Sequence, residues 1–370
     1  MYQQWTLSKI SWHLTVSKIS NTWVKNNLDN LVSRYIRLWL EIPINGTLCV
    51  ITQSKRKFGL GLILPSTRHT QCQVTFRNKI GNSSNDNIRE IHKSTAAVNV
   101  QYDQFNNTRE ALKEIRLIDE RHLLNNLTTQ SLVIKSIWNY ADSNFICKWS
   151  NVVNHLPKNI YSFVVRYLNN TLANATNAVK WGIANDSTCR FCDRQQTLGH
   201  VIGGCQHALD ELRYNWRHNS ILLHIYKTVT SQGLQAYVDI DGYPNPSIIT
   251  GEAQRPDFIL VKDDKLLVLE LTAGFETNIE SNFNRKNRRY ERLLSDLSRR
   301  YRVFYINMSL GAIGVFGKNS LFVSKMKTFD LNDETINFVI KRSINVCIRS
   351  SYYIFCMRNK EWSNPELLHW

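Results

Sequence analysis

Two carboxylates carry the clearest candidate chemistry in this chain of 370 residues. Asp257 and Glu270 stand in two runs of apolar and β-branched residues, 257–262 and 265–272, which are joined by the polar pair Asp263-Asp264. This pattern predicts a β-hairpin that places the two acids on neighbouring strands. Two such carboxylates could hold one Mg²⁺, which lowers the pKa of a bound water and stabilises the charge on a phosphate in the transition state.

A lysine on the apolar face of the next predicted helix is the third candidate. Apolar residues recur at steps of three and four, which predicts a helix over 277–300 with one buried face. The stripe consists of Ile279, Phe283, Lys286, Tyr290, Leu293 and Leu297. A lysine that points inward needs a charged partner, and a metal-binding carboxylate pair provides one. Alternatively, Lys286 extends its ammonium group to solvent or forms a structural ion pair.

Three cysteines and a histidine have the spacing of a zinc site, Cys-x2-Cys-x7-His-x4-Cys. The expected ligands are Cys189, Cys192, His200 and Cys205, and His207 is a spare donor. Two cysteines that are two residues apart reach one ion across a tight turn, and a short loop returns the second pair. Zinc would supply folding energy to a segment too polar to pack by itself. The alternative is free thiols beside an ordinary histidine.

Taken together, these motifs resemble a known family. The chain has Arg255-Pro256-Asp257, Glu270-Leu271-Thr272, Lys286 and Tyr290 downstream of the cysteine motif, with Arg217-His218-Asn219 between. This combination resembles the C-terminal restriction-like endonuclease of early-branching non-LTR retrotransposon proteins, which belongs to the PD-(D/E)XK nuclease class. Most nucleases of that class have a lysine where this chain has Thr272. In the retrotransposon branch the lysine has moved to the next helix, where Lys286 stands.

The resemblance implies a role for each matched residue. Asp257 and Glu270 would bind Mg²⁺, Lys286 would act on the attacking water or the phosphate, and Tyr290 would support the site one turn further on. The implied fold is mixed α/β, with helices around a small central sheet. The implied ligands are a DNA target and the RNA of the element. Glu276 is expected to be a favourable charge at a helix N-terminus, or else a carboxylate that supports the metal-binding pair.

The N-terminal region resembles the thumb of the same proteins, in the runs W-L-E-I-P and K-F-G-L-G-L-I-L-P. That resemblance implies that this region binds nucleic acid. The candidate contacts are Lys55, Arg56, Lys57 and Arg68, and further along the chain Arg217, His218, Arg285 and Arg289. The alternative for each is a solvated surface charge, since phosphate contacts are numerous and individually replaceable. A polymerase needs paired aspartates, whereas Asp142 in Y-A-D-S stands alone, so no polymerase activity is expected.

Composition restricts the partners and the compartment. The formal net charge is +16 and the sequence pI is about 9.5, which favours nucleic acid as the partner. The sequence contains no apolar run of membrane-spanning length and no signal-peptide core, so we expect a nuclear or cytoplasmic protein without a membrane or small-molecule ligand. In that reducing environment the remaining cysteines are expected to be buried thiols: Cys49, Cys72, Cys147, Cys347 and Cys356.

The pattern of elements predicts four regions: a thumb-like region at 1–82, a helical linker at 83–180, the zinc knuckle with the Arg-His-Asn segment at 181–228, and the nuclease at 229–370. The expected helices cover 20–40, 108–127, 130–150, the segment after Pro157, 210–226 and 331–358, with a strand at 301–308 and a loop at 83–108. In the first helix we expect a buried face made of Val24, Leu28, Leu31, Tyr35 and Trp39.

The function expected from these observations is Mg²⁺-dependent nicking of a DNA strand during retrotransposition. One alternative is a catalytically inactive remnant that binds nucleic acid through the zinc knuckle and the basic surface. A zinc-stabilised protein-interaction module is a third possibility, and it predicts no salt-dependent DNA binding.

Overall fold

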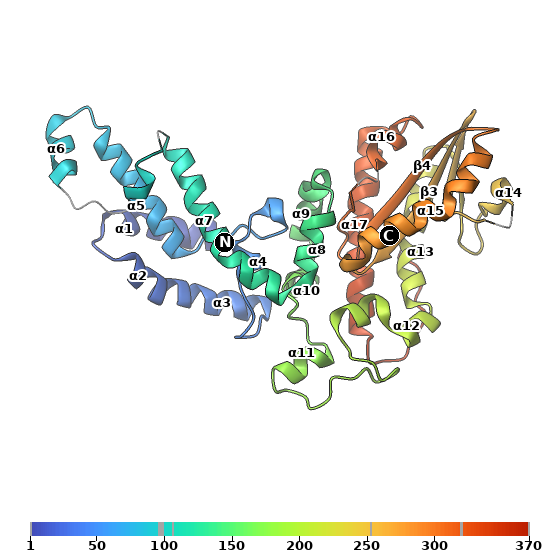
Figure 1. Ribbon diagram of the computed structural model, residues 1–370, viewed down its shortest axis with the longest axis horizontal. Helices are drawn as coiled ribbons and strands as arrows, with labels where there is room; N and C mark the ends of the chain where they lie inside the picture. Colours follow the sequence, from blue (N-terminus) through green and yellow to red (C-terminus); the bar gives the residue numbers. More distant parts are fainter. Residues whose placement is uncertain (1, 95–99, 106, 252–253, 319–320, 369–370) are drawn as a thin grey trace. The chain divides into compact units, whose positions relative to one another are not determined.

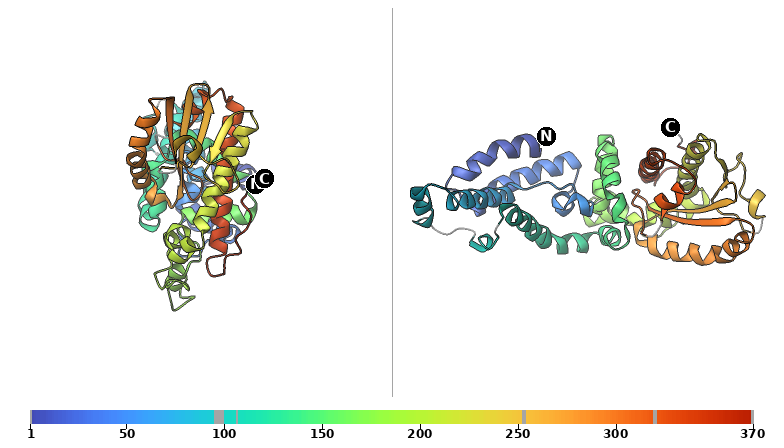
Figure 2. Two further views of the ribbon diagram at one scale, coloured as in Figure 1. Left: turned by 90° about the vertical axis from the view of Figure 1, so that its right-hand side faces the viewer. Right: turned by 90° about the horizontal axis from the view of Figure 1, so that it is seen from above.

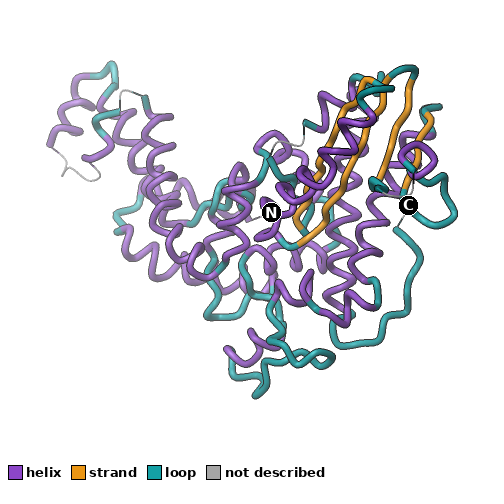
Figure 3. Tube along the Cα trace, turned by 45° about the vertical axis from the view of Figure 1, so that its right-hand side comes forward, coloured by secondary structure: helices purple, strands orange, loops and turns teal. Residues whose placement is uncertain are grey.

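The computed structural model describes residues 2–94, 100–105, 107–251, 254–318 and 321–368. These residues form two compact units, Met1–Ser131 and Leu132–Trp370. The boundary lies inside the segment predicted as a linker, 83–180, so the zinc-site segment and the predicted nuclease belong to one unit. All described strands lie in that second unit (Figure 3). Among the described residues, no helix has the length and apolar character needed to cross a bilayer.

The first unit consists of helices, and its buried residues include two small apolar clusters. One cluster contains Leu14, Val24 and Cys72, and the other contains Val74 and Ile115. The helices are α1 (Leu7–Val16), α2 (Asn21–Val24), α3 (Asn30–Leu40), α4 (Cys49–Thr52), α5 (Pro65–Gly81), α6 (Asp86–Ser94) and α7 (Thr108–Gln130) (Figure 1). Helix α5 packs against both α1 and α7, and it begins at a proline, which lacks the N–H that the first turn leaves unpaired.

The predicted buried face of the first long helix is wrong beyond its first turns. Leu31, Tyr35 and Trp39 are each about half exposed, whereas Ile36 is buried. The cause is a π-helical turn at Lys25–Asp29 between α2 and α3. A π turn adds one residue to the helix, so every later position is rotated, and the buried face passes from Val24 to Asp29 and Ile36.

Two other expected segments also differ. Residues 83–108 contain helix α6 instead of a continuous loop, because Asp86 lies in its first turn and His92 and Lys93 in its last, as the helix dipole favours; residues 95–99 and 106 lie outside the described residues. The helix expected over 130–150 is interrupted at Asp142. The carboxylate of Asp142 accepts the N–H of Asn144 at 2.9 Å and starts a 3₁₀ turn between α8 (Leu132–Tyr140) and α9 (Ile146–Asn154).

The second unit contains a four-stranded mixed sheet in the order β1-β2-β3-β4. The strands are β1 (Gln235–Val238), β2 (Phe258–Lys262), β3 (Lys265–Gly274) and β4 (Arg302–Gly311). The first three pair antiparallel, and β4 runs parallel to β3. The predicted hairpin and the strand at 301–308 are therefore confirmed, and the fold is mixed α/β.

Helices cover both faces of this sheet (Figure 2). Helix α15 (Ile279–Leu297) connects β3 to β4 across one face, while α13 (Arg213–Thr230) and α17 (Asp333–Cys356) pack together on the other. The apolar stripe predicted for α15 is confirmed at Tyr290, Leu293 and Leu297, which pack on Leu266 and Val268. The other helices are α10 (Lys158–Leu168), α11 (Ala175–Lys180), α12 (Gln206–Asp210), α14 (Ser247–Thr250) and α16 (Phe322–Lys327).

Candidate functional site

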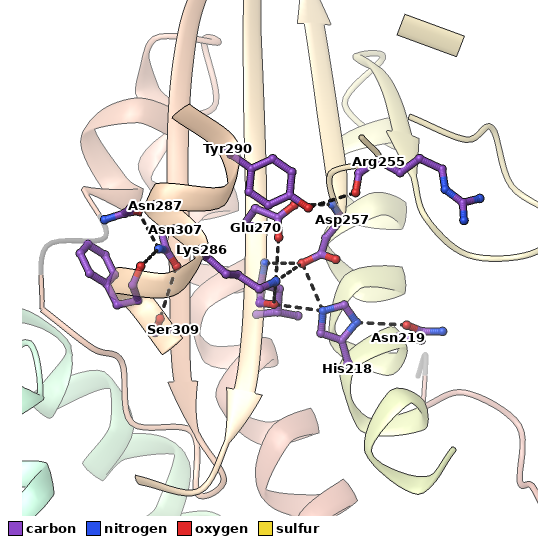
Figure 4. A network of polar contacts seen from close by, with 12 residues as sticks. His218, Asn219, Arg255, Asp257, Glu270, Lys286, Asn287, Tyr290, Asn307 and Ser309 are labelled. Carbon is purple, nitrogen blue, oxygen red and sulfur yellow. Dashed lines mark hydrogen bonds and ion pairs between the residues drawn. The ribbon is translucent and has the colours of Figure 1, made fainter. Parts of the chain in front are cut away.

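Asp257 and Glu270 lie side by side at one end of the β2–β3 hairpin (Figure 4). The pairing of Phe258 with Leu269 places Asp257, one residue before β2, beside Glu270 on β3. The N–H of Asp257 donates to Glu270 Oε1 at 2.9 Å, and the N–H of Leu271 donates to Asp257 Oδ2 at 2.7 Å. Each acid is thus oriented by the backbone of the other strand.

Lys286 reaches both carboxylates from α15. Its Nζ lies 2.8 Å from Asp257 Oδ2, 2.7 Å from Glu270 Oε2 and 2.6 Å from the carbonyl oxygen of Leu271. Only 12% of its side chain is exposed, so the inward orientation is confirmed and the solvent-directed alternative is wrong. Three oxygens therefore converge on one cation.

His218 joins this centre from α13. Its Nε2 lies 3.3 Å from Asp257 Oδ2 and 3.1 Å from the carbonyl oxygen of Leu271, and its Nδ1 lies 3.1 Å from Asn219 Oδ1. Both ring nitrogens face oxygen acceptors, an arrangement that suits the doubly protonated imidazolium. The sequence predicted a nucleic-acid contact here, and the structure places this histidine against the carboxylates.

Arg217 does not fit the phosphate contact predicted for it. It is 1% exposed, and it donates to the carbonyl oxygen of Ala273 at 2.8 Å and to Ser351 Oγ at 3.1 Å. An arginine enclosed in this way fastens α13 to β3 and α17. Its effect is to hold the next residue, His218, at the carboxylate centre.

The surroundings shift the pKa values of the two acids in opposite directions. Burial opposes the charge of Asp257, but the charges and hydrogen bonds of His218 and Lys286 outweigh it and hold the pKa of Asp257 well below its usual range. Burial and the neighbouring charge of Asp257 raise the pKa of Glu270 to about 7, although Lys286 acts in the opposite direction. Burial would lower the pKa of His218, but Asp257 reverses the effect and raises it. Two carboxyl groups whose pKa values differ in this way are typical of catalytic pairs.

Tyr290 and Asn307 support the centre from behind. The Tyr290 hydroxyl donates to the carbonyl oxygen of Arg255 at 3.1 Å, which fixes the backbone just before Asp257. The Asn307 side chain on β4 donates to Asn287 Oδ1 at 2.7 Å and to the carbonyl oxygen of Phe283 at 2.8 Å, and so ties α15 to the sheet. Sequence reasoning missed Asn307, whose signal is a lone amide within an apolar strand, and it missed the backbone carbonyl of Leu271.

Glu276 lies in the first turn of the short 3₁₀ helix that leads into α15, as expected for a charge at a helix N-terminus, but its carboxyl group is completely buried. It accepts hydrogen bonds from the Tyr167 hydroxyl and, at 3.1 Å, from the N–H of Ile313. Gly311 provides the space that the Glu276 carboxyl group occupies, since a Cβ at position 311 would lie 2.5 Å from Glu276 Oε1. Burial raises the pKa of Glu276 to about 7.

The burial of Glu276 predicts a pH-dependent stability. Its pKa rises from 4.5 to about 7 on folding, so the free energy of unfolding falls as the pH rises through this window. The loss is about 3 kcal/mol. In Glu276→Gln this loss is absent. Urea unfolding of both proteins at about pH 5 and about pH 8 measures it, and an identical pH dependence in the two would contradict the assignment.

The predicted zinc ligands come together. The ligand atoms of Cys189, Cys192, His200 and Cys205 all lie within 4.8 Å of one another and could hold a metal ion such as zinc. Cys205 Sγ lies 3.9 Å from Cys189 Sγ and 3.8 Å from Cys192 Sγ. Thiolates about 2.3 Å from a tetrahedral ion are about 3.8 Å apart, so the spacing suits zinc.

The spare donor and the other cysteines lie outside this cluster. His207 stacks on Phe191, with ring centroids 4.2 Å apart. The predicted burial of the remaining thiols is correct for Cys49, Cys72 and Cys347. It is wrong for Cys147 and Cys356, both of which are exposed.

The other candidate nucleic-acid contacts are divided between the two units. In the first unit Lys55 and Arg56 are exposed, Lys57 pairs with Glu120 at 2.9 Å, and Arg68 donates to Ser11 Oγ at 2.9 Å. In the second unit, Arg285 and Arg289 are exposed on α15.

Comparison with protein-family models and with curated protein sequences finds no match for this chain. Two candidate sites stand out among the described residues. One is a centre where two carboxylates, a backbone carbonyl, a lysine and a histidine meet at the end of a hairpin. The other is a cluster of three cysteines and one histidine.

Proposed function

We propose that this protein is a metal-dependent DNA endonuclease of the PD-(D/E)XK type, which nicks a target strand in retrotransposition. The observation that carries the proposal is the convergence of Asp257 Oδ2, Glu270 Oε2 and the Leu271 carbonyl oxygen on Lys286 Nζ. The mixed sheet with helices on both faces agrees with the fold expected for that class.

The donor set suits Mg²⁺. Hard divalent cations take oxygen ligands, and Mg²⁺ in nucleic-acid enzymes is held by one or two carboxylates together with waters and substrate phosphates. Asp257, Glu270 and the Leu271 carbonyl would hold it, and the ammonium group of Lys286 already marks the place where these oxygens attract a cation. When bound, Mg²⁺ would lower the pKa of a water and neutralise charge on the phosphate.

The remaining residues act around this oxygen cluster. Lys286 carries an ammonium group beside the place where the phosphate charge would increase, and it can donate to a phosphate oxygen or to the attacking water. His218 donates to the oxygen cluster and keeps Asp257 ionised. Arg217 and Tyr290 hold the backbone on either side in position.

We also propose that the Cys189–Cys205 segment holds a structural zinc ion. The side chain of Tyr214 joins this segment to α13, because its hydroxyl accepts the N–H of Cys205 at 3.1 Å and lies 3.2 Å from the His200 carbonyl oxygen. Helix α13 carries His218, so the metal cluster supports the helix that completes the catalytic centre.

Nicking of supercoiled plasmid tests the proposal. The native protein should produce nicked circles with Mg²⁺ and none with EDTA, and Lys286→Met should lower the rate about a hundredfold, the usual contribution of a positioned proton donor. Arg292→Met, an exposed basic residue of the same helix, is the matched control and should retain activity. Plasmid binding without metal-dependent nicks would favour the inactive nucleic-acid-binding remnant.

A further inference from the structure

A cavity of about 420 Å³ opens directly beside the carboxylate centre. Its size lies within the roughly 300–1,000 Å³ range of ligand pockets. Four parts of the second unit form it: the end of β3, the N-terminal half of α15, the start of α13 and the edge of the zinc-site segment. Its lining includes Asn215, His218, Thr272, Asn282, Arg285 and Lys286.

Several polar groups in this cavity have unused hydrogen-bonding capacity. The hydroxyl oxygen of Thr272 is buried and has no hydrogen-bond partner among the described residues. Asn215 and Arg285 are exposed and Asn282 is half-buried, so their polar atoms are open to a ligand. A buried hydroxyl without a partner costs about 1–3 kcal/mol. Such a hydroxyl is rare in native proteins, and in this cavity it lies among polar side chains that are open to solvent. This combination favours a polar ligand.

The position of the cavity indicates the chemical class of this ligand. His218 and Lys286 line it and also contact Asp257. A ligand here would therefore lie beside the carboxylate centre and next to Lys286, the residue proposed to act on the scissile phosphate. Arg285 suits a phosphate group. Asparagine amides pair with base edges, most favourably with the N6 and N7 atoms of adenine. Together these groups match one nucleotide.

We propose that the cavity is a nucleotide subsite that seats one nucleotide of the cleaved strand next to the scissile phosphate. The amides of Asn215 and Asn282 face the base edge, and Arg285 faces the adjoining phosphate. The subsite thus gives the enzyme a base preference, for adenine, at one position beside the cut. This inference rests on the proposed nuclease function, and it assigns specificity to residues outside the carboxylate centre.

Mapping of nick positions in a plasmid library with randomised sequence tests the subsite. The native protein should show enrichment of adenine at one position next to the nick. Asn282→Ala should reduce that enrichment about tenfold, the usual value of a base-reading amide. Asn284→Ala, an exposed asparagine two residues along the same helix, should leave it unchanged. Equal profiles for the two variants, or no base preference in the native protein, would overturn the subsite.

The same variants separate this inference from the nuclease proposal. If the native protein makes no nicks, the nuclease proposal fails, and the subsite is then tested by fluorescence anisotropy with labelled DNA duplexes in Ca²⁺. These duplexes differ in a single base at each position in turn. A base-dependent affinity that is lost in Asn282→Ala and kept in Asn284→Ala supports the subsite. If affinity depends on the base in the same way in Asn282→Ala and in Asn284→Ala, the subsite is overturned.

Discussion

Asp257→Asn is expected to lower metal-dependent nicking by at least about a thousandfold, which corresponds to roughly 4 kcal/mol of transition-state stabilisation. The substitution removes the charge from the group on which Leu271 N–H, Lys286 and His218 converge. A neutral amide is a weak Mg²⁺ ligand, so the oxygen cluster loses its metal affinity. Because the amide oxygen still accepts the Leu271 N–H, the hairpin should keep its register and the variant should fold.

The matched control is Asp264→Asn, which changes an exposed aspartate in the turn at the opposite end of the same hairpin. Initial nicking rates at several Mg²⁺ concentrations, at equal zinc content, compare the three proteins. The control should behave as the native protein does. If Asp257→Asn nicks at the native rate with the native Mg²⁺ dependence, the carboxylate centre is not the catalytic site.

The elements that hold this centre could be predicted because their patterns are local. Alternating apolar residues around Asp263-Asp264 define the hairpin, and steps of three and four define the buried face of α15. Lys286 interrupts that face, so the pattern placed it on the buried side of α15 but left open whether its ammonium group points inward or reaches solvent. The cysteine spacing was equally informative, because a metal cluster needs few residues close together in sequence.

Contacts between distant segments could not be predicted. His218 meets Asp257 across 39 positions of sequence, and Tyr167 meets Glu276 across 109, and no periodicity encodes such pairs. Arg217 was expected to contact a phosphate or to be a solvated surface charge, yet it is buried and donates to Ala273 and Ser351. The π turn at Lys25–Asp29 has no sequence signature, so the face of α3 was misassigned.

Cys192→Ser is expected to release the metal ion from the cysteine–histidine cluster and to destabilise the second unit by about 5 kcal/mol or more. A loss of that size lowers the melting temperature by roughly 10–20 °C in a unit of this size. The damage should extend beyond the cluster. Gly199 approaches so closely that a Cβ there would lie 3.0 Å from the ring of Phe275, and the Tyr214 hydroxyl joins the segment to α13.

The control is Cys356→Ser, which alters an exposed thiol outside the cluster and should keep both metal and stability. Zinc content by mass spectrometry and thermal unfolding by circular dichroism compare the two variants with the native protein. Zinc binding to the native protein at one ion per chain, and its loss in Cys192→Ser alone, would support a structural ion. Equal zinc content and equal melting temperatures in both variants would show that these thiols are ordinary packing groups. Because His218 is carried by α13, loss of the ion should also reduce nicking, although none of the cysteines contacts the carboxylates.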